Sequence, residues 1–147
     1  MRYLNDEELQ ISSRFLFLSM ALVVIQQDIQ LFKKGHFKIK ELYLNPLEKM
    51  ETAGINERKE LKKIMQKKQL KVFTLTKNDS FSSFLFVCRG KEEKRNYFNP
   101  AIRKKVEVIL QELMKKAIQQ HDLHDVSAKT AAAYQVSNGI EQSFESD

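Results

Sequence analysis

The chain has 147 residues, of which 42% are hydrophobic and 30% charged, with 4 glycines, 2 prolines and a single cysteine, Cys88. This size and composition fit one domain with one core. A single cysteine excludes an internal disulfide framework and favours a reducing compartment. The charge is uneven, since residues 1–32 carry a net −2, residues 33–120 a net +12 and residues 121–147 a net −4. A basic middle region is typical of a polyanion-binding surface or of solvated lysine-rich helices.

An apolar block from Phe15 to Ile25, interrupted only by Ser19, dominates the N-terminal part of the chain. The block lies inside a pattern with the three-to-four spacing of a helical face, formed by Leu18, Leu22, Ile25, Ile29 and Phe32. We therefore expect a helix from about Asp6 to Lys34. Asn5 or Asp6 would cap its start, and Gly35 would end it in a left-handed conformation.

The length of this block argues against a membrane span. A bilayer needs about 20 consecutive apolar residues, and Gln26, Gln27 and Asp28 follow the block directly. The preceding residues lack the basic start and small-residue cleavage site of a signal peptide. We expect a soluble cytoplasmic protein with no membrane partner, in which this helix is surrounded by protein because it is apolar on all sides.

A second helix is expected from about Leu44 to Lys68, opened by the Asn45–Pro46 pair. Its apolar stripe is thin around Gly54, and a glycine inside a helix costs about 1 kcal/mol relative to alanine. This helix is therefore either continuous or kinked at Gly54, where Asn56 could start a new helix. The inner stripe consists of Leu47, Met50, Gly54, Leu61, Ile64 and Met65.

A β-hairpin is expected at about residues 71–89. The run from Lys71 to Thr76 is rich in β-branched and aromatic residues, residues 77–80 form a turn, and Phe81 to Cys88 alternates in a second run. A lone two-stranded hairpin is marginal in water, so it should pack on the helices. Leu85 and Val87 lie on the opposite face from Phe84 and Phe86, which suggests cover from a second subunit.

The rest of the chain reads as a charged connector, a third helix and a tail. Residues 90–97 are the connector, and Asn99–Pro100 opens a helix that reaches about residue 120. Its stripe consists of Ile102, Val106, Ile109, Leu110, Leu113 and Ile118. Residues 121–147 are expected to be a polar, disordered tail. The predicted fold is mainly α, one domain over residues 1–120, with three long helices and one hairpin between the second and third.

The candidate chemical sites all have simpler structural explanations. His121 and His124 are too few ligands for zinc, which normally needs three or four. Cys88 lies on an apolar strand without a histidine nearby in sequence, which is typical of a small buried hydrophobe. Glu92 and Glu93 are better explained as partners of neighbouring cations than as an acid–base pair. We therefore expect no catalytic, cofactor or metal site.

Two segments resemble a known group of proteins. The run RGKEEKRNYFNPAIR over residues 89–103, and the connector Phe37-Lys38-Ile39-Lys40, are similar to short uncharacterised proteins of Bacillales bacteria, of the YhjD-like kind. The resemblance covers roughly residues 10 to 115. It implies a small cytoplasmic bacterial protein, and it assigns no activity and no functional residue.

The expected function is that of a non-enzymatic accessory or regulatory protein acting through protein contacts. The apolar surplus of the first helix exceeds what three helices and a hairpin would cover, so we expect a homodimer. The alternative is a nucleic-acid-binding regulator with a basic helical face, although a recognition helix normally follows a tight turn that is not obvious here. This face would consist of Lys62, Lys63, Lys67, Lys68, Arg103, Lys104 and Lys105.

Overall fold

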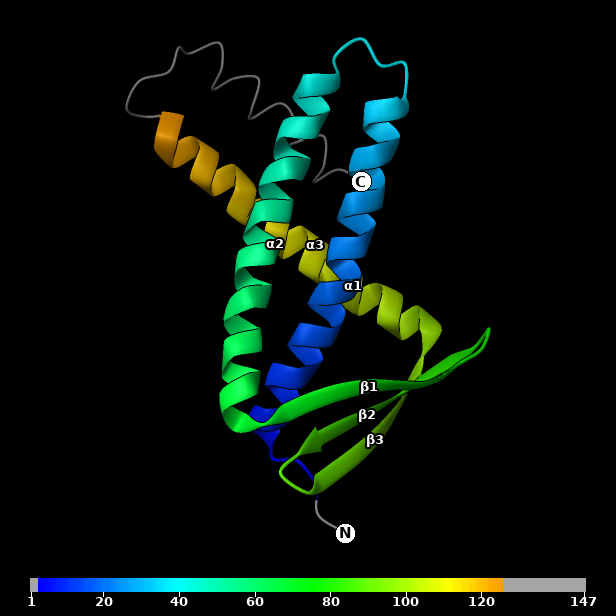
Figure 1. The fold of residues 1–147 in the computed structure, drawn as a ribbon. Coiled ribbons are helices and arrows are strands. Elements are labelled where there is room, and N and C mark those ends of the chain that lie inside the picture. Colours follow the sequence, from blue (N-terminus) through cyan, green and yellow to red (C-terminus); the bar gives the residue numbers. More distant parts are fainter. Residues whose placement is uncertain (1–2, 126–147) are drawn as a thin grey trace.

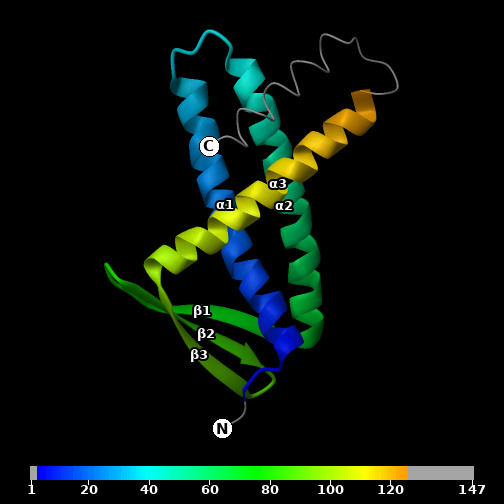
Figure 2. The same ribbon diagram turned by 180° about the vertical axis from the view of Figure 1, so that it is seen from behind.

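The computed structural model describes residues 3–125, with side chains described for residues 3–119. The elements in chain order are α1 (Asp6–Lys34), α2 (Lys40–Lys68), β1 (Leu70–Lys77), β2 (Phe81–Cys88), β3 (Lys91–Phe98) and α3 (Asn99–Asp125). The helices α1 and α2 form an antiparallel pair, and α3 crosses both on one side (Figure 1 and Figure 2). The sheet lies at the end of this pair where α1 begins and α2 ends.

Helix α1 begins and ends where its sequence predicted. Asn5 caps it through a reciprocal pair of bonds, in which the Glu8 amide donates to Asn5 Oδ1 (2.8 Å) and the Asn5 amide donates to Glu8 Oε1 (2.9 Å). The expected left-handed end is wrong, because Gly35 has an extended backbone with φ −73°. A Cβ at Gly35 would meet the ring of Phe37, so this exposed ring would have to move for another residue to fit.

Helix α2 starts at Lys40, earlier than predicted, so Pro46 lies inside the helix rather than at its first position. The helix is continuous through Gly54, so no new helix starts at Asn56. Gly54 is buried, and a Cβ at this position would lie 2.8 Å from Leu22 Cδ2 and 3.4 Å from Leu113 Cδ1. The glycine therefore lets α2 approach α1 and α3 closely at the point where the three helices meet.

The predicted hairpin is wrong as a description of the sheet. The structure contains a three-stranded antiparallel sheet in the order β1-β2-β3, and β3 replaces the expected charged connector. Leu70 pairs with Cys88, which pairs with Lys91 on its other side, while Phe81 pairs with Phe98 at the far end. The missed strand has no apolar alternation, because most of its residues are charged.

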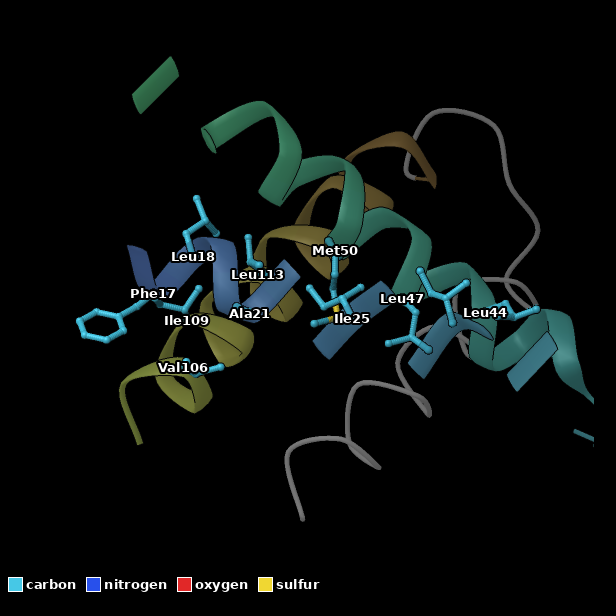
Figure 3. Packing of buried hydrophobic residues seen from close by; sticks show 12 residues of the cluster. Phe17, Leu18, Ala21, Ile25, Leu44, Leu47, Met50, Val106, Ile109 and Leu113 are labelled. Carbon is cyan, nitrogen blue, oxygen red and sulfur yellow. The ribbon is translucent and has the colours of Figure 1, made fainter. Parts of the chain in front are cut away.

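The hydrophobic core has two connected parts. The larger one joins α1, α2 and α3, and Figure 3 labels residues that each of the three helices contributes to it. The smaller one packs the sheet, through Phe84 and Phe86, against the first turns of α1. Tyr97 links them, since its ring is 5.3 Å from that of Phe17 in an edge-on contact and 6.0 Å from that of Phe84.

Helix α3 continues to Asp125, beyond the predicted limit of about residue 120. The first residues of the predicted polar tail are thus helical. The remainder of that segment, residues 126–147, lies outside the described residues, as do the side chains of His121 and His124.

Candidate functional site

An open groove of about 610 Å³ runs along one flank of α3 where this helix crosses α1 and α2. Its apolar lining comes from all three helices and consists of Val24, Ile25, Leu47, Met50, Leu110, Met114 and Ile118. Its polar lining residues are Asp28, Glu107, Gln111 and Lys115, and all four are exposed. The groove is therefore an apolar trough with charges of both signs on its rim.

The position of the groove follows from the two apolar rows of α3. Val106, Ile109, Leu113 and Ala117 form the row that is buried against α1 and α2. Leu110, Met114 and Ile118, spaced four residues apart, form a second row that faces the groove. The sequence pattern predicted Leu110 and Ile118 as part of a single inner stripe, and Met114 was not predicted. The four-residue spacing beside the main stripe is the signal that could have identified it.

Helix α1 leaves apolar side chains on the surface. Val23 is 51% exposed and Leu31 is 66% exposed. By length and composition α1 could cross a bilayer, although the core helix of a soluble protein meets the same criteria. A third of its most apolar window is buried against the rest of the described chain. The structure therefore covers only part of the apolar block that the sequence contains.

The basic residues proposed for nucleic-acid binding are not brought together. Lys62, Lys63, Lys67 and Lys68 lie at the end of α2, which leads into the start of β1, whereas Arg103, Lys104 and Lys105 lie in the first turns of α3. These two groups are at opposite ends of the strands (Figure 1). The seven-residue offset between Lys91 and Phe98 corresponds to about 23 Å at about 3.3 Å per residue. The sequence-predicted face is thus two separate clusters.

Several of these cations also have local partners. Lys68 Nζ lies 3.4 Å from Glu7 Oε1, and Lys63 Nζ lies 3.4 Å from Glu60 Oε1. Lys105 Nζ is 5.8 Å from the centre of the Phe17 ring. Part of the positive charge of the middle region is therefore paired within the fold.

An ion cluster ties the three helices together on another face. The Arg14 guanidinium on α1 donates to both carboxylate oxygens of Glu57 on α2, at 2.6 and 3.0 Å, and to Glu112 on α3 at 2.8 Å. The hydrogen bond from Arg14 holds the pKa of Glu57 below its ordinary value, and Arg14 in turn has a raised pKa. This geometry is that of a structural clamp, because each carboxylate is engaged by a permanent cation.

A second polar cluster joins α1 to the sheet. Lys91 Nζ lies 2.6 and 2.8 Å from the carboxylate oxygens of Glu8, and this bond is the main cause of lowering the Glu8 pKa from 4.5 to about 2. The Cys88 thiol donates to the same carboxylate at 3.3 Å. Burial, followed by the Glu8 carboxylate, raises the Cys88 pKa, which disfavours the nucleophilic thiolate.

The two glutamates after β2, Glu92 and Glu93, are consecutive residues of β3 with different surroundings. Glu93 is buried and its carboxylate lies 2.5 Å from Arg95 Nε, whereas Glu92 is exposed. They are on opposite faces of β3, so they do not form a carboxylate pair. Within the described part of the chain, histidine, cysteine and acidic side chains form no cluster able to hold a metal ion.

Comparison with known proteins places the chain in a family. The family model described as "YhjD protein" matches residues 3–118. The uncharacterised protein YhjD of Bacillus subtilis (strain 168) is 27% identical over 107 residues, which cover 73% of this chain and 89% of the relative. No solved structure matches. The family model spans most of the chain and confirms the resemblance found in the sequence, so this protein belongs to the YhjD family.

Proposed function

We propose that this protein is a non-enzymatic accessory or regulatory protein of the cytoplasm, which acts through protein contacts and works as a homodimer. The observation that carries the proposal is the groove along α3, with its apolar lining and exposed polar rim. Acid–base catalysis usually relies on a titratable group whose pKa is shifted by burial in the site. An apolar trough is instead suited to burying apolar side chains of another protein.

A second copy of the chain is the partner that we propose for this surface. A two-fold contact uses one patch on both subunits, so the patch must complement itself. Leu110 and Met114 of α3 line the same groove as Val24 of α1 and Leu47 of α2, and the first two are half-buried. In a two-fold contact, each copy would therefore cover these apolar side chains of its partner.

The surroundings of the groove support the same assignment. The rim carries Asp28 and Glu107 as well as Lys115, so two copies can meet without a uniform like-charge repulsion. The nucleic-acid alternative has less support, because its basic residues are split between two ends of the sheet.

Light scattering coupled to size-exclusion chromatography, over a wide range of protein concentration, tests the proposal. We expect a dimer for the wild-type chain and a monomer for Met114→Glu, because the variant would bury a charge in the apolar contact. Ile64→Glu is the matched control, since Ile64 is 39% exposed on α2 and does not line the groove. A wild-type chain that is monomeric throughout, or a Met114→Glu variant that stays dimeric, would refute the homodimer.

A further inference from the structure

The strand β1 has a free edge. Among the described residues the strand order is β1-β2-β3, so within residues 3–125 β1 is hydrogen-bonded to a neighbouring strand on one side only. The register is regular from Leu70 to Thr74 and is then shifted by a bulge before Thr76. Along the regular part, every second residue directs its backbone N–H and C=O away from β2. This edge therefore offers alternating donors and acceptors to an added strand.

A hollow of about 730 Å³ lies against this edge, between β1 and the end of α2. Three of its lining residues are cations, namely Lys62 from α2, Lys71 from β1 and Arg89 from the turn after β2, and all three are exposed. Its described lining contains no carboxylate. Phe73, which is 48% exposed, and the half-buried Val72 provide apolar contacts on the two faces of β1.

The charge of the hollow selects among the partners that could cover the edge. A second copy of β1 would bring another set of the same cations to the same place, and like charges across a strand pair are destabilising. A nucleic acid would satisfy the cations, but phosphate oxygens only accept hydrogen bonds and would leave the N–H and C=O alternation of the edge unused. An acidic polypeptide satisfies both features.

We propose that β1 binds an acidic, extended segment of another protein, which adds to the sheet as a fourth strand. The backbone of this segment pairs with Leu70 to Thr74, and its carboxylates lie near Lys62, Lys71 and Arg89. Pairing through the main chain gives affinity, while the cations and Phe73 select the side chains. This site is distinct from the groove along α3, and neither proposal depends on the other.

Fluorescence anisotropy with a labelled peptide of alternating glutamate and valine tests the proposal on the full-length protein. We expect the acidic peptide to bind and its glutamine counterpart to bind much more weakly. Lys71→Glu and Arg89→Glu should each weaken binding by roughly fivefold, because each removes one exposed charge pair and adds a repulsion. The matched control Lys38→Glu, in the α1–α2 loop, should leave binding unchanged.

Two further measurements test whether the peptide binds as an added strand at β1. A peptide that is N-methylated along one edge keeps its charge but loses its donors, so it should no longer bind. Equal binding of this peptide, of the glutamine peptide, or of a single-stranded oligonucleotide of matched charge would overturn the proposal. A variant with Glu141, Glu145 and Asp147 changed to glutamine controls for the acidic residues of the chain itself. Peptide binding that appears only in this variant would show that the site is filled internally and would also overturn it.

Discussion

The close packing of Gly54 against Leu22 leads to a prediction for the variant Gly54→Ala. Whether this change stabilises or destabilises the protein should depend on the Leu22 side chain. A Cβ at Gly54 would lie 2.8 Å from Leu22 Cδ2, and Leu22 is itself buried. The Gly54→Ala change gains about 1 kcal/mol of helix propensity. Overpacking a well-filled core costs about 1–3 kcal/mol. The variant should therefore be destabilised by roughly 0–2 kcal/mol relative to wild type.

Removing the neighbour should reverse the effect. In a Leu22→Ala background the colliding methyl group is gone, so Gly54→Ala should stabilise the protein by about 1 kcal/mol through helix propensity alone. Urea unfolding followed by circular dichroism, for the four members of this cycle, measures the difference. Asn56→Ala, at an exposed position of the same helix, should have the same effect in both backgrounds. An equal effect of Gly54→Ala in both backgrounds would show that close packing does not explain this glycine.

The two polar clusters give further expectations, which unfolding experiments can check. The Glu8 pKa is lowered from 4.5 to about 2, chiefly by Lys91, so its contribution to stability is present above pH 4.5 and is lost as the pH falls toward 2. The free energy of unfolding of Glu8→Gln should thus fall less steeply between about pH 5 and pH 3 than that of wild type, and parallel curves would contradict this assignment. Arg14→Met should cost about 1–3 kcal/mol, because it leaves the half-buried Glu57 carboxylate without its main partner. Lys63→Met, which removes an exposed ion pair, should change stability by less than about 1 kcal/mol, and an equal cost for both changes would refute the clamp.

The helices were predictable because their signals are local. The limits of α1 follow from Asn5, the acidic first turn, the apolar periodicity and the lysines of its last turn, and all of these are read from neighbouring residues. The start of α2 was harder to predict, because Ile39 makes no side-chain cap. The Asn45–Pro46 pair, which lies inside the helix, has the sequence pattern of a helix start. Gly54 was interpreted through its propensity cost, although its packing partners on α1 and α3 are remote in the sequence.

The third strand was missed because ion pairs, rather than an apolar alternation, accompany its pairing with β2. Lys91 on β3 pairs with Glu8 of α1, and the buried Glu93 pairs with Arg95 of the same strand. An alternation of charged residues does not indicate a strand by itself, since strand prediction relies on apolar alternation. The charges are tolerated because each inward-facing one of these residues has an oppositely charged neighbour.

The same strand explains why the candidate site could be predicted only in part. Leu47, Met50 and Leu110 were identified as inner-face residues, but a groove between them requires knowledge of how α3 crosses the other helices. Because β3 carries the chain to the far end of the sheet, α3 must start there and return across α1 and α2 (Figure 2). A helix that crosses at an angle covers the middle of the α1–α2 pair and leaves a trough on its flank. β3 therefore places the start of α3, with Arg103, Lys104 and Lys105, at the end of the sheet away from the lysines at the end of α2.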